Sequence, residues 1–229
     1  MAPGVFVARL PELDLNVVAV AGPEGFALVD TGSYERETRG LLAGLERMLS
    51  EHGLPYRALA VVNTHGHFDH CYGNAEVLRQ FPDVEIVAHE ALPAYLAEWG
   101  ERGRADALRY GMPADDMAAV RIVPPTVLVP HDGSLPLGVM GAEVYAPGRG
   151  HTGCDVVVHV PDADLLVAGD LLEESAPPSY GPDSYPDEWP GALERVLELP
   201  ASVLVPGHGA LVDRDFAERQ LAYVRGRRA

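Results

Sequence analysis

Four side chains that can bind a metal ion are concentrated in one short segment, HGHFDH, as His65, His67, Asp69 and His70. Zinc is bound by imidazole nitrogen and carboxylate oxygen at about 2.0 to 2.2 Å, so a site needs several such groups within one small volume. Capping of the helix expected to begin near Asp69 would account for one polar residue and not for four. The segment therefore predicts a metal site.

Further histidines and aspartates lie in short motifs elsewhere in the chain. Taken singly, His151 and His208 could equally be turn residues, and Asp170 a solvated carboxylate at a strand end. Together the motifs resemble, in type and order, those of the metallo-β-lactamase superfamily along nearly the whole chain. They are Val29-Asp30-Thr31-Gly32, His-x-His-x-Asp-His at 65–70, Gly150-His151-Thr152, Ala168-Gly169-Asp170 and Pro206-Gly207-His208-Gly209.

This resemblance implies a site with two divalent metal ions. His65, His67 and His151 would bind one ion, Asp69, His70 and His208 the other, and Asp170 would bridge them. Asp30 would brace the site without binding metal. Zinc is the expected metal, but Asp170 stands where some β-lactamases of the superfamily have a cysteine, and a carboxylate is also compatible with iron or manganese.

Such a pair of ions predicts hydrolysis without a side-chain nucleophile. Two metals about 3.5 to 4 Å apart lower the pKa of a shared water and present it as hydroxide. We expect attack on the carbonyl carbon of an ester, thioester, lactone or amide in a small molecule. Asp69 is the expected catalytic residue, because its carboxylate would orient the attacking hydroxide.

The hydrophobic pattern favours an α/β fold in which both halves of the chain run from strands into a helix. Residues 59–63 form an apolar run that leads directly into the HGHFDH segment, which places the cluster on a loop after a buried strand. Two βα layers packed face to face predict an αββα four-layer sandwich. Strands are expected at 4–10, 16–21, 25–29, 59–63, 84–88, 120–129, 141–146, 156–160, 165–168 and 202–205, and helices at 35–52, 73–81, 91–119 (broken near Gly111), 192–199 and 214–225.

Two aromatic-bearing segments are candidates for the walls of a substrate site. Residues 173–189 carry Tyr180, Tyr185 and Trp189 among prolines, which predicts a stiff flap with these three as substrate-binding residues. Residues 91–116, with Tyr95, Trp99 and Tyr110, form a second wall or a dimer surface. Cys71 and Cys154 are expected near the metals as small buried residues and not as ligands.

Composition limits the remaining function classes. The chain has 229 residues, 34 acidic against 17 basic and a formal charge of −17, and no linker divides it, so we expect one domain over 1–229 and no nucleic-acid partner. All the basic residues are arginines, which excludes a lysine nucleophile and a P-loop. The N-terminus lacks a secretory pattern, and no apolar run approaches the roughly 20 residues of a membrane helix. The expectation is a cytoplasmic protein acting on a small molecule, as a monomer or homodimer.

Several alternatives stay open within this framework. A mononuclear iron persulfide dioxygenase resembles the same scaffold with two histidines and an aspartate, and metal analysis would distinguish it from a binuclear hydrolase. A class B β-lactamase is less favoured, because those enzymes are mostly exported and often use a lysine that this chain lacks. A glyoxalase II is disfavoured by the roughly 20 residues after His208. A lactonase or thioesterase remains, as does a metal-binding protein without catalysis.

Overall fold

The strands form a mixed sheet that folds over on itself. The computed structural model describes residues 4–226. Strands pair in the order β6-β5-β4-β3-β2-β11-β10-β9-β8-β7. β1 lies outside this order and pairs antiparallel with β2. The two halves of the sheet are joined where β11 pairs with β2, through the residue pair His208 and Leu15. The strands are β1 (Val5–Leu10), β2 (Leu15–Gly22), β3 (Gly25–Val29), β4 (Ala58–Val62), β5 (Glu85–His89), β6 (Val127–Val129), β7 (Ser134–Pro136), β8 (Glu143–Tyr145), β9 (Val157–Val160), β10 (Leu165–Glu173) and β11 (Val203–His208).

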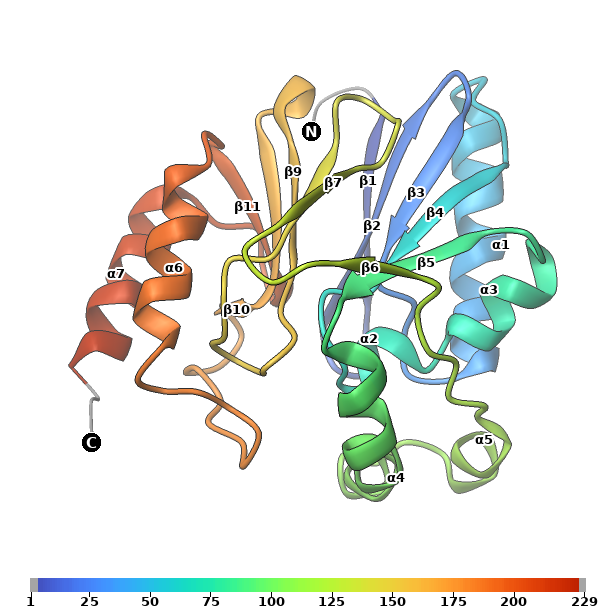
Figure 1. The fold of residues 1–229 in the computed structure, drawn as a ribbon. Helices are drawn as coiled ribbons and strands as arrows, with labels where there is room; N and C mark the ends of the chain where they lie inside the picture. Colours follow the sequence, from blue (N-terminus) through green and yellow to red (C-terminus); the bar gives the residue numbers. More distant parts are fainter. Residues whose placement is uncertain (1–3, 227–229) are drawn as a thin grey trace.

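Helices cover both outer faces of the folded sheet (Figure 1). One half lies against α1 (Glu35–Glu51) and α3 (Asn74–Gln80), and the other against α6 (Trp189–Glu198) and α7 (Arg214–Arg225). The other α-helices of residues 4–226 are the short α2 (Phe68–Cys71), α4 (Leu92–Arg109) and α5 (Ala114–Ala119), and a 3-10 helix lies at Pro161–Ala163. The predicted αββα four-layer sandwich is thereby confirmed.

Alternation along the strands explains the layering. On β2, Val18 and Val20 belong to the apolar core between the two sheet halves, whereas Val17 and Ala19 belong to the core under α1. Successive side chains of a strand point to opposite faces, so a strand that is apolar on both faces, as β2 is over 17–21, can join two cores. The helix pattern at 35–52 is likewise explained, because the leucines of α1 are buried in the second core.

Three parts of the predicted strand pattern differ from the structure. The strand expected at 120–129 is confined to β6, because Pro124 and Pro125 have no backbone N–H to donate to a neighbouring strand. β10 continues to Glu173, although Gly169-Asp170 reads as a strand end; Gly169 adopts a φ of +54°, and the register with β11 shifts on both sides of it. A glycine bulge therefore lets the strand carry Asp170 without ending. The three-residue strand β7 was missed because Gly133 and Pro136 mark it as a turn. In addition, no helix among residues 4–226 is long and apolar enough to cross a membrane.

The cluster predicted at 65–70 lies at one end of the sandwich. β4, β10 and β11 all run towards this end, so the loop after β4 meets the C-terminal parts of the other two strands. The helix α4 and the loop 174–188 lie at the same end (Figure 1). Segments from both halves of the chain thus come together there, at the junction between β2 and β11.

Candidate metal centre

Asp30 holds the HGHFDH loop in place. Its carboxylate accepts hydrogen bonds from the backbone N–H and the hydroxyl of Thr64, both at 2.8 Å, and from His70 Nδ1 at 2.8 Å. Asp30 itself is 1% exposed and has a φ of +65°, a conformation that aspartate tolerates better than most residues. The Asp-Thr-Gly turn after β3 therefore braces a candidate ligand histidine, which is the role that the resemblance implied for this position.

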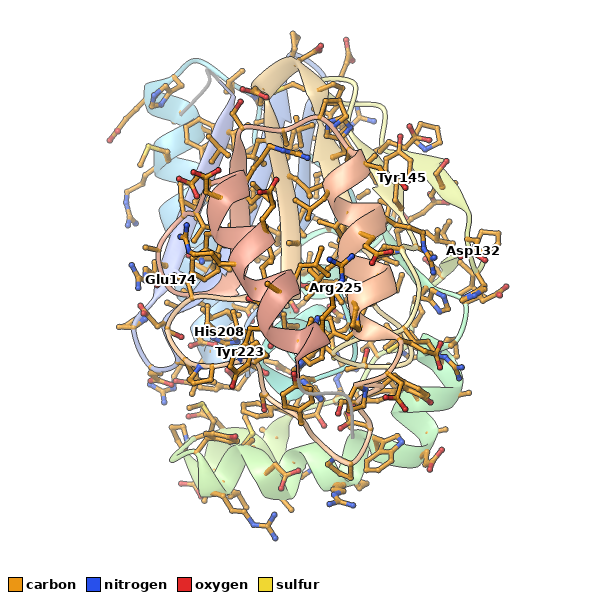
Figure 2. All side chains as sticks on the ribbon, turned by 90° about the vertical axis from the view of Figure 1, so that its left-hand side faces the viewer. Asp132, Tyr145, Glu174, His208, Tyr223 and Arg225 are labelled. Carbon is orange, nitrogen blue, oxygen red and sulfur yellow. The ribbon has the colours of Figure 1, made fainter. Side chains whose placement is uncertain are left out.

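The structure brings all seven predicted ligands together, in two adjacent groups. One consists of His65, His67, His151 and Asp170, and the other of Asp69, His70 and His208; within each group the candidate ligand atoms lie within 4.8 Å of one another. Figure 2 shows His208 near Glu174, at the end of the sandwich that faces α4. The division of the residues between the groups follows the predicted one.

Three histidines engage their outer ring nitrogens in hydrogen bonds with protein acceptors. His67 Nε2 donates to Asp183 Oδ2 at 2.9 Å, His70 Nδ1 to Asp30, and His208 Nδ1 to the carbonyl oxygen of Leu13 at 2.8 Å. Metal-binding histidines usually have such a partner, which fixes the tautomer and leaves the other nitrogen with a free lone pair.

The outer nitrogens of the remaining two histidines have weaker contacts, and that of His151 has no hydrogen-bond partner among the described residues. His151 Nδ1 lies 3.3 Å from a carboxylate oxygen of Glu173, and His65 Nδ1 lies 3.1 Å from the hydroxyl of Thr64. Each of the five imidazoles therefore turns its other nitrogen inward, towards the shared space.

The inward-facing atoms fit a pair of metal ions. His151 Nε2 lies 2.9 Å from His67 Nδ1, and His70 Nε2 lies 3.4 Å from His208 Nε2. Among the described residues, His65 Nε2 and Asp170 Oδ1 are buried without a hydrogen-bond partner, although buried polar atoms rarely are. Several imidazole nitrogens therefore surround one carboxylate, and some of these buried atoms have no hydrogen-bond partner. A divalent cation bound between them would supply the missing interaction.

Asp170 lies between the two groups. Its Oδ1 is 3.2 Å from His70 Nε2, and its Oδ2 is 3.4 Å from His151 Nε2 and 3.5 Å from His208 Nε2. This closeness requires glycine opposite it, because a Cβ at Gly207 would come within 1.7 Å of Asp170 Oδ1. The arrangement suits a bridging carboxylate and explains the Pro-Gly-His motif at the end of β11.

The charges of the site also suit cation binding. Burial lowers the pKa of His65 well below its ordinary value, which keeps this imidazole neutral. Burial opposes ionisation of Asp170, but the surrounding histidines hold its pKa well below the usual range. Asp69 is also buried, and His70 and His208 lower its pKa to about 2. Burial opposes the charged form of His151 and His208, but Asp170 and the other neighbouring carboxylates raise the pKa of His151 to about 9 and that of His208 to about 12, so binding of a metal ion would displace protons from these imidazoles.

The two groups form the floor of a cleft of about 750 Å³. Tyr95, Trp99 and Tyr110 line it, so the segment proposed as a second wall does form one. The three aromatic residues of the flap do not line the cleft. Trp189 is 0% exposed, its indole N–H donates to Leu171 O, and its ring supports His151 from behind at 5.6 Å between centroids.

The other two flap residues also have packing roles. Tyr180 packs against Trp189, and the Tyr185 ring lies 4.3 Å from the guanidinium of Arg149. Tyr180, Tyr185 and Trp189, which were expected to bind substrate, are therefore absent from the cleft lining and have packing contacts instead. Proline and aromatic content predicted an ordered segment, but it could not indicate which side of the segment faces the cleft.

Asp183 is the residue of the site that sequence reasoning missed. It lies in the predicted flap, where an aspartate among prolines reads as a turn residue. Its side chain is 8% exposed, and its Oδ2 accepts hydrogen bonds from both His67 Nε2 and the hydroxyl of Tyr95, the latter at 2.6 Å. These contacts join the flap, the α4 wall and a candidate metal ligand.

Both cysteines lie beside the ligand loop, as expected, and are buried. Cys71 Sγ contacts the carbonyl oxygens of Gly66 and His67. Burial raises the pKa of Cys71 well above its ordinary value and raises that of Cys154 as well. A thiol that stays protonated is a poor ligand and a poor nucleophile, so the geometry supports a packing role.

We predict that Asp183→Ala weakens metal binding at the group that contains His67. The imidazole loses the acceptor that fixes its tautomer, and loss of such a partner costs about 10- to 100-fold in metal affinity. Competition with a chromophoric chelator measures the change. Tyr95→Phe removes the other donor to the same oxygen but leaves His67 bonded, so it should change affinity less than Asp183→Ala; an equal loss would contradict this assignment.

Comparison with known proteins identifies the family. The model of the metallo-beta-lactamase superfamily matches residues 10–208. The chain therefore belongs to the metallo-β-lactamase superfamily. Within it, the paired His/Asp groups make this protein a metallo-hydrolase.

Individual relatives have different activities. A type 2 metallo-beta-lactamase of Bacillus cereus is 29% identical over 204 residues, 87% of this chain and 68% of its own length. The human acyl-coenzyme A thioesterase MBLAC2 is 28% identical over 213 residues, 84% of this chain and 72% of its own length. Family membership therefore leaves the substrate open.

Solved structures agree on the fold. The DIM-1 metallo-beta-lactamase superimposes with a TM-score of 0.75 at 20% identity, covering 99% of this chain and 95% of its own. A metallo-beta-lactamase from Pontibacter korlensis gives a TM-score of 0.74 at 24% identity, with 99% and 97% covered. At these identities the agreement concerns the fold.

Proposed function

We propose that this protein is a binuclear zinc hydrolase that cleaves an ester, thioester, lactone or amide bond of a small molecule. The observation that carries the proposal is the position of Asp170 between two histidine groups on the floor of an open cleft. When bound, a pair of divalent ions supplies Lewis acidity and water of lowered pKa. The relatives named as a β-lactamase and an acyl-CoA thioesterase favour carbonyl substrates.

The side chains around this floor have separable roles. His65, His67 and His151 would hold one ion, and Asp69, His70 and His208 the other. Asp69 lines the cleft and is ionised, so its carboxylate can accept a hydrogen bond from water and orient it towards a substrate. The protonated, buried cysteines offer no competing nucleophile.

Two other functions are compatible with the scaffold. A mononuclear iron persulfide dioxygenase needs one metal, whereas both groups are complete here. A β-lactamase has the support of the Bacillus cereus relative, but all the basic residues here are arginines. Metal analysis of the purified protein tests the first alternative, because one iron per chain would replace our proposal.

The hydrolase proposal is tested by a substrate screen on zinc-loaded protein with ester, thioester, lactone and lactam compounds. We expect turnover of at least one class, and loss of about a thousandfold or more in His67→Ala, because several kcal/mol of transition-state stabilisation depend on the metals. His131→Ala is the matched control, since His131 is exposed and is not among the residues lining the cleft. Full metal loading without turnover would indicate a metal-binding protein without catalysis.

A further inference from the structure

One face of α4 forms the wall of the cleft next to the ligand loop. Tyr95, Trp99 and Arg102 follow one another at spacings of four and three residues, which places them in a row along the helix, and all three line the cleft. Tyr95 begins the row at the metal centre, because its hydroxyl donates to Asp183, which also accepts from His67.

The row presents flat apolar surface and ends in a positive charge. The rings of Tyr95 and Trp99 are stacked, with 6.2 Å between centroids and 20° between planes. The guanidinium carbon of Arg102 lies 5.0 Å from the centre of the Trp99 ring. A guanidinium held on an aromatic face keeps its planar N–H donors available for a carboxylate or phosphate.

Arg102 is the arginine of this wall that forms no ion pair with a carboxylate of the described residues. Arg109, the other arginine that lines the cleft, forms an ion pair with Asp106 at 2.5 Å. Within residues 4–226, Arg102 forms no ion pair, and its contact is with Trp99. Glu98 and Asp106 lie one turn before and after Arg102 on α4, and Asp106 is paired with Arg109 instead.

The floor of the cleft does not supply that missing partner. Five carboxylates line the cleft: those of Asp69, Asp170, Glu173 and Asp183 lie on its floor and rim, and that of Asp106 is paired with Arg109 on the α4 wall. Two divalent cations bound at the floor would carry four positive charges, which equals the four negative charges of the carboxylates on the floor and rim. The charge of Arg102 then remains uncompensated, about 10 Å along the helix from Tyr95 at the usual rise of 1.5 Å per residue.

We propose that the α4 wall is a binding subsite for an oxyanion of the substrate, with Arg102 as the residue that selects for it. The substrate class is then an acyl compound with a carboxylate or phosphate group that is separated from the cleaved bond by a flat or apolar portion. This inference rests on the proposed hydrolase function, because it concerns the substrate of that same cleft.

A kinetic comparison tests the subsite with matched substrates on zinc-loaded protein. The substrates are the 4-nitrophenyl hemiester of nonanedioic acid, the uncharged 4-nitrophenyl nonanoate, and the phosphonate analogue of the hemiester. We expect Arg102→Gln to lower kcat/KM about tenfold for the anionic compounds and less than twofold for the uncharged ester. The ratio between the carboxylate and phosphonate compounds identifies which oxyanion fits. Arg57→Gln, an exposed arginine outside the cleft, is the control.

A binding measurement provides a readout without turnover. The chain has two tryptophans, of which Trp99 lines the cleft and Trp189 is buried, so quenching by a cleft ligand reports on Trp99. We expect 4-phenylbutyrate and phenyl phosphate to quench saturably, 4-phenylbutyramide to bind about tenfold more weakly, and Arg102→Gln to remove the difference.

The two measurements separate the two proposals. Anion binding that depends on Arg102, without hydrolysis of any compound, would support the subsite and contradict the proposed reaction. Hydrolysis with equal effects of Arg102→Gln on charged and uncharged esters would overturn the subsite and leave the reaction standing. Anion binding unchanged in Arg102→Gln would also overturn the subsite, because the oxyanion would then bind at the metal centre alone.

Discussion

Replacing Asp170 by alanine is expected to reduce metal content below two ions per chain and to lower kcat/KM by about a thousandfold or more. Asp170 is the one predicted ligand whose oxygens lie within 3.5 Å of nitrogens from both groups. Its removal therefore affects both ions, whereas a histidine substitution affects one group directly. Elemental analysis after gel filtration, together with steady-state kinetics on the best substrate from the screen, measures the two effects.

Two companion variants make this result specific. Asp170→Asn keeps the size of the side chain but removes its charge, so we expect it to retain more metal than Asp170→Ala and still lose most activity. Asp187→Ala changes an exposed aspartate of the loop 174–188 and should resemble the parent protein. Two tightly bound ions in Asp170→Ala would show that Asp170 does not bridge them.

The seven predicted ligands could be proposed from sequence because each lies in a short, recognisable motif. His65, His67, Asp69 and His70 share one loop, so their proximity is local and follows from spacing. The positions of His151, Asp170 and His208 depend on strands far apart in the chain, and here only the order of the motifs linked them. The resemblance therefore supplied what spacing could not.

The partners of the ligands were harder to predict. Asp183 reaches His67 across 116 residues of sequence, through a loop whose path depends on the packing of Trp189 under Gly150 and His151. Neither its residue type nor its neighbours distinguish it from the other acidic residues of the segment. The aromatic residues that drew attention there are the ones that fix the loop, which is why the segment was identified and its cleft-facing residue was not.

Asp30→Ala is expected to lower the free energy of unfolding of the metal-free protein by about 4 kcal/mol. The substitution leaves the buried N–H of Thr64 and the Nδ1–H of His70 without the acceptor that they share, and each unsatisfied buried donor costs about 1 to 3 kcal/mol. Alanine also tolerates a φ of +65° poorly, which adds about 1 kcal/mol. Urea denaturation in the presence of a chelator measures the change without a contribution from bound metal.

Asp132→Ala separates these two contributions. Asp132 has a φ of +56°, but its side chain is 62% exposed, so its replacement carries the backbone cost without the buried contacts. We expect a loss of about 1 kcal/mol there, and the remaining 3 kcal/mol or so in Asp30→Ala then belongs to the contacts with Thr64 and His70. Equal losses in the two variants would show that the carboxylate of Asp30 does not support the ligand loop. The Asp-Thr-Gly turn would then matter for its backbone conformation alone.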